Sequence, residues 1–374
     1  YLDVAVFENF RNIEHFPFTF SPGMNILFGG NAQGKTAVIE GIYLFAGGKS
    51  FRRARDKDMI KNNKDFSQIS ISYTDEKREN KMSLRYFREL KKECFLNGVK
   101  TKKMSEFVGN FKAVLFCPEH LAIVKDEPSV RRAFIDSAIS QIKPAYLGAL
   151  IEYGKLTEQK NALLKNAENY SISAFEDVYS VYSQKTAESS AYITSVRAEY
   201  LSRLFEYVKA FLLDMTDGKE TVSYEYISNI SCEGCDLSDR EENVKKYIET
   251  IKNGAEREKA AKTSVFGAHR DDFDIKLPIG SAKIFASQGQ QRSIALALKL
   301  AEGELCREET GEYPVFLFDD VLSELDSRRQ RYLLESIHDI QTMITGTGVD
   351  DFVENNFKIN RLFQVTDGTV SQKN

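Results

Sequence analysis

The sequence predicts an α/β fold in which a sheet unit covered by helices is interrupted by an inserted, mainly α-helical segment. Three observations predict it. Met24–Phe28 is a short apolar run, and a glycine-rich turn and a helical pattern follow it. Pro314–Asp320 is a second apolar run that ends in two carboxylates, as expected for a parallel strand with helices on both faces. Between them, from about Arg131 to Lys262, apolar residues recur at helical spacing.

These patterns divide the 374 residues into three parts. Residues 1–130 form the N-terminal part of the sheet unit and include a β-rich lobe. Residues 131–262 form the helical segment, which we expect to be a lid-like domain, and residues 263–374 complete the sheet unit. A chain of this length is too long for one compact α/β unit, so a second subdomain is expected.

The turn after the first apolar run carries a phosphate-binding motif. It fits the P-loop pattern G-x-x-x-x-G-K-[ST], and its backbone N–H groups and the start of the following helix would face a polyphosphate. Lys35 would bind the β- and γ-phosphates, and the Thr36 hydroxyl would hold Mg²⁺. We therefore expect all eight motif residues to bind nucleotide: Gly29, Gly30, Asn31, Ala32, Gln33, Gly34, Lys35 and Thr36.

Strand patterns follow in the first part. Ile69–Tyr73 and Met82–Tyr86 alternate with period two, as half-buried strands do. Asn97 and Gly98 form the dipeptide that favours a tight hairpin. These patterns predict the β-rich lobe.

Basic residues gather between Asp75 and Lys103, where ten of them stand against five acids. Such a segment could face the phosphate backbone of DNA with salt-sensitive affinity, or it could be an ordinary solvated strand face. The sequence leaves both interpretations open. The loop with Lys49, Arg52 and Arg53 is a second candidate contact. The ten residues are Lys77, Arg78, Lys81, Arg85, Arg88, Lys91, Lys92, Lys100, Lys102 and Lys103.

The inserted segment predicts long helices, because no proline stands between Pro144 and Pro278 to break one. It is too short for long coiled-coil arms and shows no sustained heptads. One helical face is expected to carry Ile193, Val196, Tyr200, Leu204, Val208 and Phe211.

A further helix is predicted to begin after Ser287. Ser287 and Gln290 form an S-x-x-Q capping box, and strong helix formers continue to Ala301. Gly289 would let the backbone approach a ligand closely. The pattern fits either a well-terminated helix or a ligand-binding helix start.

Two carboxylates end the apolar run near the C-terminus. Asp319 is placed to hold the Mg²⁺ shell in the Walker B role, and Asp320 to act as general base on the attacking water. The alternative is a buried strand followed by an acidic helix cap. Thr345, at the end of the next strand (Thr342–Thr345), is the nearest polar candidate for sensing the γ-phosphate.

The order of these motifs resembles that of ABC-type P-loop ATPase heads, and their particulars resemble the RecF family of SMC-like proteins. The resemblance runs nearly end to end. It rests on residues 7–12 (Phe-Glu-Asn-Phe-Arg-Asn), 30–36, 49–52, 116–119, 128–136, 159–165, 267–272, 287–293 and 319–326.

The resemblance implies ATP as the nucleotide and Mg²⁺ as the metal. Leu322–Asp326 resembles the D-loop, and Arg52 is implied to couple nucleotide to DNA. The resemblance also implies a signature segment, which reaches a nucleotide held by a second copy. This segment consists of Ser287, Gln288, Gly289 and Gln290.

The function implied by the resemblance is slow, DNA-stimulated ATP hydrolysis in recombinational and replication-gap repair. An ATP-driven homodimer would clamp duplex DNA near single-strand gaps or junctions. The implied protein partners are RecR and RecO, with RecA loaded downstream.

Several residues depart from the usual patterns. The base position holds Asp320, where transporter heads carry Glu, and no His ends the next strand. Ala37 stands where the RecF pattern has Asn. No Q-loop glutamine is evident, and Glu119 in that region receives no role. A shorter catalytic base and the absence of a sensor His favour a slow, switch-like ATPase over a fast motor.

Composition agrees with this interpretation. The net charge of −4 gives no global DNA signature, so any DNA contact must come from a local patch. Neither an 18-residue apolar run nor a signal-peptide pattern occurs, so we expect a cytosolic protein with no membrane contact. Its five cysteines are then expected to be free thiols. Cys232 and Cys235 predict a turn with two thiols, because no second pair stands at zinc spacing.

Two other classes of function are compatible with a P-loop. In a DNA clamp or scaffold, ATP would be a ligand and its hydrolysis incidental. The ATPase subunit of a membrane transporter is disfavoured, because Ser287 follows Thr36 by 251 positions, far more than in transporter heads.

Overall fold

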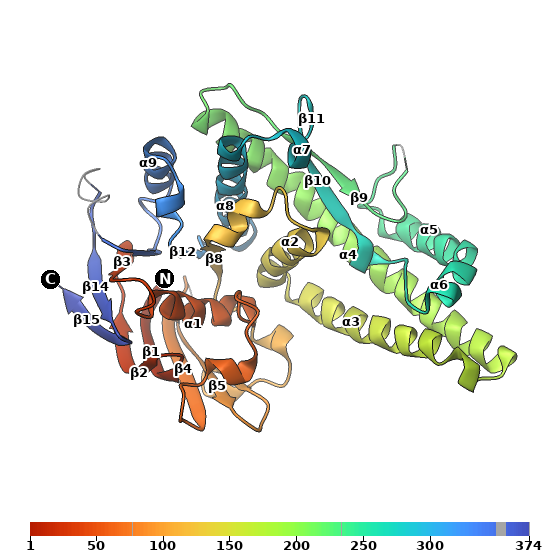
Figure 1. Ribbon diagram of the computed structural model, residues 1–374, viewed down its shortest axis with the longest axis horizontal. Coiled ribbons are helices and arrows are strands. Elements are labelled where there is room, and N and C mark those ends of the chain that lie inside the picture. The colour runs from red at the N-terminus through yellow and green to blue at the C-terminus, as the bar shows by residue number, and fades with distance from the viewer. Residues whose placement is uncertain (77, 233, 349–356, 374) are drawn as a thin grey trace.

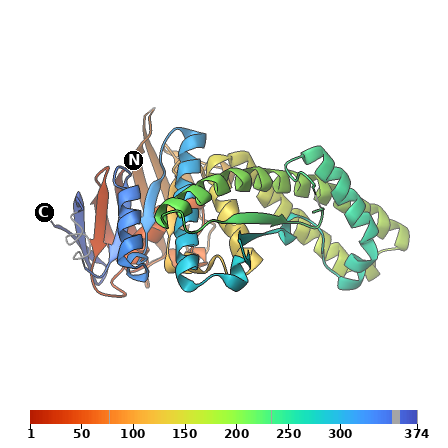
Figure 2. The ribbon, with the colours of Figure 1, turned by 90° about the horizontal axis from the view of Figure 1, so that it is seen from above.

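The computed structural model describes residues 1–76, 78–232, 234–348 and 357–373. Lys77 of the basic segment and Glu233 of the C-x-x-C stretch lie outside the described residues. The molecule is elongated, with the sheet unit and both termini at one end and a helical arm extending to the other (Figures 1 and 2). The predicted α/β class is confirmed.

The central sheet has the strand order β15-β14-β3-β13-β12-β8, and only β15 runs antiparallel to its neighbour. Its strands are β3 (Met24–Phe28), β8 (Ala113–Phe116), β12 (Val315–Phe318), β13 (Thr342–Gly346), β14 (Arg361–Thr366) and β15 (Thr369–Lys373). Leu317 packs into the core with α1 (Lys35–Gly47), whereas Phe316 and Phe318 pack into the core with α8 (Gln288–Thr310). Burial on both faces explains why β12 is apolar at every position.

The predicted β-rich lobe is an antiparallel sheet of order β2-β1-β4-β5-β6-β7. Its strands are β1 (Leu2–Phe10), β2 (Ile13–Thr19), β4 (Phe66–Thr74), β5 (Glu79–Phe87), β6 (Glu93–Leu96) and β7 (Val99–Lys100). Ile71 pairs with Met82, and both side chains are buried, as their alternation predicted. Asn97 and Gly98 turn between β6 and β7 with φ of 49° and 82°, which confirms the hairpin.

The arm comprises α3 (Pro144–Lys165), α4 (Ile172–Met215), α5 (Arg240–Asn253) and α6 (Ala255–Ala261), and α2 (Pro128–Ile142) joins it to the sheet unit. The predicted apolar face lies on α4: Ile193 and Leu204 are fully buried, and Phe211 is partly buried.

One feature of the arm differs from the sequence prediction. β9 (Ser223–Ile227) interrupts the helices and pairs with β10 (Asp272–Leu277), which pairs with β11 (Gly280–Ser281). This small sheet crosses the expected boundary at residue 262, and the boundary itself remains a prediction. The remaining elements are α7 (Ala282–Phe285), α9 (Ser327–Ser336) and the 3₁₀ turns η1 (Asp56–Met59), η2 (Met104–Glu106), η3 (Pro118–Ala122), η4 (Ala167–Asn169), η5 (Ala268–Arg270) and η6 (Leu322–Glu324).

Two ion pairs of buried arginines lie where the arm begins, one between α4 and α2 and the other between α2 and β10. Arg197 of α4 donates from Nε and Nη2 to the carboxylate of Asp136, both at 2.9 Å. Arg131 of α2 donates from Nε and Nη2 to Asp272, both at 2.7 Å. Paired donors in fork geometry set orientation as well as distance, so the arm leaves the sheet unit in a defined direction.

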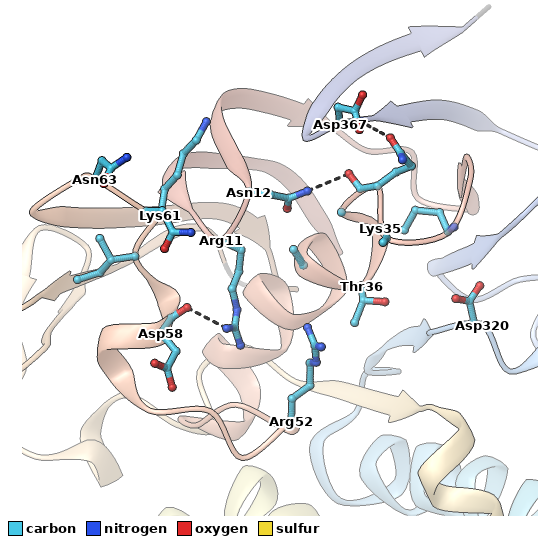
Figure 3. A pocket seen from close by; sticks show the side chains of 16 residues that line it. Arg11, Asn12, Lys35, Thr36, Arg52, Asp58, Lys61, Asn63, Asp320 and Asp367 are labelled. Carbon is cyan, nitrogen blue, oxygen red and sulfur yellow. Dashed lines mark hydrogen bonds between the residues drawn. The ribbon is translucent and has the colours of Figure 1, made fainter.

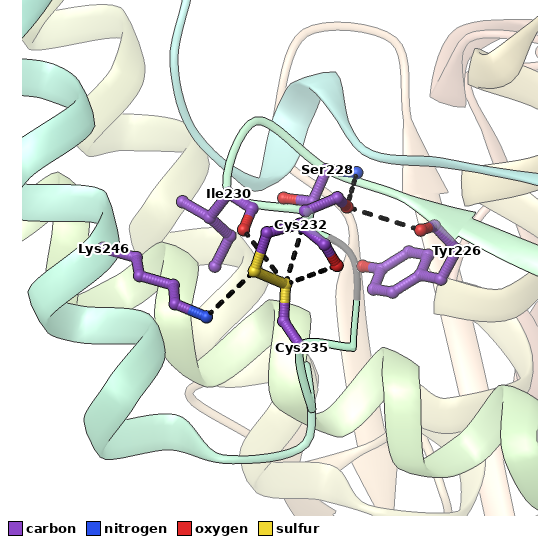
Figure 4. Close-up of a disulfide and its surroundings, with 7 residues drawn as sticks. Tyr226, Ser228, Ile230, Cys232, Cys235 and Lys246 are labelled. Atoms are coloured by element: carbon purple, nitrogen blue, oxygen red, sulfur yellow. Dashed lines mark hydrogen bonds between the residues drawn. A yellow bond between two sulfur atoms is a disulfide. The ribbon is translucent and has the colours of Figure 1, made fainter.

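The expectation of five free thiols is wrong for one pair. Cys232 and Cys235 are joined by a disulfide in the loop after β9, and Lys246 Nζ lies 3.5 Å from Cys232 Sγ (Figure 4). The C-x-x-C spacing allowed either state, and the chain path brings the two sulfurs together. Cys94, Cys117 and Cys306 are free and buried.

Within the described residues, none of the helices has the length and apolarity needed to cross a membrane.

Candidate nucleotide-binding site

The P-loop turns between β3 and α1 through two positions that only glycine can occupy. Gly29 has φ +154°, and a Cβ there would lie 2.2 Å from the carbonyl O of Val365. Gly34 has φ +115°, and a Cβ there would lie 2.7 Å from Asn12 Nδ2. The loop is therefore clamped between the β1–β2 turn and β14, which holds its backbone close to the cavity.

Helix α1 begins at Lys35 with no side-chain cap on its first turn, as far as the described chain shows. The free N–H groups and the helix dipole at this end favour an anion. Lys35 is only 3% exposed, and its Nζ donates to the carbonyl oxygens of Gly29 (2.8 Å) and Gly30 (2.9 Å). The ammonium is thus held inside the loop that would surround a phosphate.

Asp319 joins the P-loop to the end of β12. Its Oδ1 accepts hydrogen bonds from Thr36 Oγ1 (3.0 Å) and Thr345 Oγ1 (2.9 Å). Burial raises the pKa of Asp319, and the two hydroxyl groups partly offset this effect. A hydroxyl and a carboxylate in contact beside a phosphate loop form the ligand set that Mg²⁺ uses with a nucleotide, so these residues fit the metal.

Asp320 lines the cavity at the end of β12, on the other side of Thr36 from Arg11 (Figure 3). Its backbone is left-handed, with φ 51°, and its N–H donates to Thr345 Oγ1 at 2.9 Å. Asp320 also lines an adjoining hollow of about 440 Å³ with Asn31 and Ser323. Its general-base role remains a prediction. The hydroxyl of Thr345, the predicted sensor, is engaged by both Asp319 and Asp320.

A cavity of about 850 Å³ extends from the P-loop across the β-rich lobe. Arg52, predicted from the sequence, reaches into it toward Thr36 (Figure 3). Sequence reasoning missed the other walls, which include Arg11, Asn12, Asp58, Lys61, Asn62, Asn63 and Asp367. The Asn-Phe-Arg-Asn run at residues 9–12 could have indicated Arg11 and Asn12, because it belongs to the family pattern, but the sequence alone assigned no function to it.

The carboxylate of Glu40 holds two parts of this cavity wall in place. It lies on α1, is fully buried, and accepts hydrogen bonds from Arg11 Nε (2.9 Å) and Nη2 (2.6 Å). Ser50 also donates to Glu40, and Ser50 Oγ accepts the backbone N–H of Arg52 at 3.1 Å. One carboxylate thus ties Arg11 and the basic loop to the P-loop helix.

The signature segment (Ser287–Gln290) starts α8. Ser287 caps the helix by accepting the N–H of Gln290 at 3.2 Å, and the Gln290 side chain accepts the N–H of Ser287 at 3.0 Å, which confirms the capping box. Asp326 of the D-loop (Leu322–Asp326) caps α9. Among the described residues, neither segment contributes its predicted residues Ser287, Gln288, Gly289, Gln290 or Asp326 to the 850 Å³ cavity.

The structure brings together the two basic candidates for DNA contact. Arg88 Nε donates to the carbonyl O of Lys64 at 2.7 Å, and Lys92 Nζ donates to that of Gly48 at 2.9 Å. The loop after β5 therefore lies against two segments, the residues around Lys64 and the start of the basic loop that follows Gly48. Lys100 is paired with Glu93 at 2.5 Å, whereas Lys91, Lys102 and Lys103 are exposed.

Comparisons with known proteins find relatives over nearly the whole chain. The family model described as "RecF/RecN/SMC N terminal domain" matches residues 1–371. The chain is 37% identical over 364 residues to the "DNA replication and repair protein RecF" of Clostridium novyi (strain NT), covering 97% of this chain and 98% of that protein. It is 36% identical over 375 residues to the protein of the same description from Clostridium acetobutylicum, covering 100% and 99% of the two chains.

Solved structures are similar as well. "Structure of the recombination mediator protein RecF-ATPrS in RecFOR pathway" superposes with a TM-score of 0.92 at 32% identity, covering 100% of this chain and 98% of that one. An Smc head bound to the C-winged helix domain of ScpA has a TM-score of 0.55 at 15% identity, covering 100% and 97%, and shows the fold alone.

Proposed function

The chain belongs to the RecF family of SMC-like ABC ATPases, and from this membership we propose that it is an ATP-dependent DNA-binding protein of recombinational and replication-gap repair. The observation that carries the proposal is the hydrogen-bonded cluster of Thr36, Asp319 and Thr345, which joins the P-loop helix to the ends of β12 and β13. The related structure described as RecF-ATP supports ATP as the nucleotide.

The residues of the cavity would divide the work of binding ATP. Lys35 would exchange the carbonyl oxygens of Gly29 and Gly30 for the β- and γ-phosphates. Thr36 and Asp319 would hold Mg²⁺, which when bound neutralises phosphate charge. Asp320 would accept the proton of the attacking water at its carboxylate.

The signature segment and D-loop would act on a second copy. Among the described residues, Ser287–Gln290 and Asp326 do not line the 850 Å³ cavity of their own chain, which supports a composite site with one P-loop facing the partner's signature segment. ATP would thus draw two heads together, and the dimer would clamp duplex DNA near single-strand gaps. Hydrolysis would release the DNA. The implied partners are RecO and RecR, with RecA loaded downstream.

Basic residues of the β-rich lobe support a link between nucleotide and DNA. Arg52 lies on the cavity wall, the exposed Lys91 lies between β5 and β6, and the exposed Lys102 and Lys103 follow β7. Closing two heads would bring two such sets of basic residues to one duplex. Phosphate contacts of this kind give affinity without reading sequence.

A second candidate is a DNA clamp in which ATP is a ligand and hydrolysis is incidental. One observation favours it: Thr345 Oγ1 already donates to Asp319 and accepts from the Asp320 N–H. The residue nearest the sensor position is therefore already bonded to the carboxylate of Asp319 and the backbone N–H of Asp320, which is consistent with very slow turnover.

The test is to size the protein with and without ATP and Mg²⁺, in the presence and absence of gapped DNA. The wild type should dimerise with ATP, and Asp320→Asn should bind ATP, stop hydrolysing it and remain dimeric on DNA. Asp339→Asn, an exposed carboxylate outside the cavity, serves as the control. Hydrolysis by Asp320→Asn at the wild-type rate would place the base elsewhere, and an ATP-independent monomer would reject the clamp.

A further inference from the structure

Arg329, in the first turn of α9, connects the D-loop to the signature helix within one chain. Its Nη2 donates to the carbonyl O of Gly289 and its Nε to Ser293 Oγ, both at 2.9 Å. Its Nη1 forms an ion pair with Asp326, and its backbone N–H donates to Asp326 Oδ1 at 3.0 Å. A single guanidinium therefore holds both the start of α8 and the residue that caps α9.

The bond set requires a guanidinium. Its planar fork presents several N–H groups in fixed directions, whereas the ammonium of lysine is a point charge on a flexible chain. Gly289 leaves room for it, because a Cβ there would lie 3.3 Å from Arg329 Nη2. The charge of Arg329 and its backbone N–H also lower the pKa of Asp326 against the opposing effect of burial, so the carboxylate stays ionised.

The neighbouring arginine points the other way. Arg328 Nη2 donates to the carbonyl O of Met215 and to Asp217 Oδ2 at the end of α4, both at 2.8 Å. The first turn of α9 thus contacts the arm through Arg328 and the signature helix through Arg329. The two arginines have separate partners, so their effects can be separated by mutation.

We propose that Arg329 is a positioning residue that joins the D-loop and the signature segment into one preformed surface for the nucleotide of a second copy. The inference rests on the proposed function, because it concerns the composite site of the dimer. Each segment has exposed residues, Ser287 and Gln288 in the signature segment and Ser323 and Asp326 in the D-loop, and these would lose conformational freedom on closure if they were free. The Arg329 bonds order them beforehand, which strengthens association without adding a contact to the partner.

The first experiment compares Arg329→Ala and Arg329→Lys with wild type. Titration with fluorescent ATP on dilute monomer should give an unchanged affinity, because the P-loop is untouched. Sedimentation velocity with ATP and Mg²⁺ should show dimerisation weakened roughly tenfold or more, the effect expected from losing charged hydrogen bonds. Lysine should not restore it. Arg331→Ala, an exposed arginine on the same helix, is the matched control.

The second experiment mixes Arg329→Ala with Lys35→Ala. Each variant alone has no complete composite site. A mixed dimer has one, formed by the P-loop of Arg329→Ala and the signature segment of Lys35→Ala. We expect dimers to reappear with one trapped ATP per pair, which a misfolded protein could not provide.

The outcomes are distinguishable. Wild-type protein that stays monomeric with ATP overturns the proposed function. Wild-type dimers matched by equal dimers of Arg329→Ala overturn the inference alone. Recovery by Arg329→Lys would show that charge suffices, and weak monomer ATP binding without complementation would show a structural role; either result also overturns it.

Discussion

Replacing Glu40 with glutamine tests whether the buried ion pair under the cavity wall positions the nucleotide site. Glu40 is 0% exposed and accepts two hydrogen bonds from Arg11 and one from Ser50. Glutamine keeps the size of the side chain and removes its charge. One of its two terminal groups becomes a donor that faces the donors of Arg11.

The expected loss in the free energy of unfolding depends on the solvent exposure and the hydrogen bond that Arg11 keeps. Removing one partner of a buried ion pair costs about 3–5 kcal/mol, because the other charge is left uncompensated. The Arg11 side chain is 19% exposed, and its Nη1 still donates to the carbonyl O of Asp58 at 2.8 Å. We therefore expect the lower limit, about 3 kcal/mol off the free energy of unfolding. ATP affinity should also fall, because Arg11 and the loop carrying Arg52 lose their common anchor.

Urea denaturation followed by circular dichroism measures the first effect, since the chain has no tryptophan. Titration with fluorescent ATP measures the second. Glu14→Gln is the control, because the carboxylate of Glu14 is exposed where it pairs with Lys61 and Lys64 in the same lobe, and its loss should not shift the transition measurably. A Glu40→Gln protein that unfolds with the wild type, or no earlier than Glu14→Gln, would refute the reasoning.

Three further predictions follow from the site and the arm. Lys35→Ala should bind ATP roughly ten- to a hundredfold more weakly by fluorescent-nucleotide titration; unchanged affinity would reject the P-loop assignment. Replacing Lys102 and Lys103 with alanine should flatten the log–log dependence of DNA affinity on salt by roughly two units if both contact duplex phosphates. An unchanged slope would make them an ordinary solvated face. Burial lowers the pKa of His269 to about 4, below its unfolded value, so stability should be constant above about pH 6.5 and fall toward pH 4 by up to about 3 kcal/mol. Urea unfolding across this range should show a flatter dependence for His269→Gln, and an equal slope would assign the proton uptake to another group.

Features that depend on a few neighbouring residues could be predicted from the sequence. The P-loop, the capping box at Ser287 and the strand at residues 315–318 were all predicted, because each rests on residue types at short fixed spacing. The Asn97–Gly98 hairpin was predicted for the same reason. The identity of these elements required no knowledge of what they pack against.

Contacts between residues far apart in the sequence could not be predicted in this way. Thr36 and Asp319 are hydrogen-bonded across 283 residues of sequence, and Arg11 and Glu40 across 29. No local period records such pairs, since they follow from the order of strands in the sheet and from burial of both its faces. β9 escaped the sequence analysis because its five residues form no apolar run and none of them is buried, and because its partner β10 lies beyond two intervening helices. The contact between the two basic loops and the hydrogen bonds of Arg329 could not be predicted for the same reason. Contacts between elements depend on how the whole chain packs, and the spacing of residues along the chain does not record it.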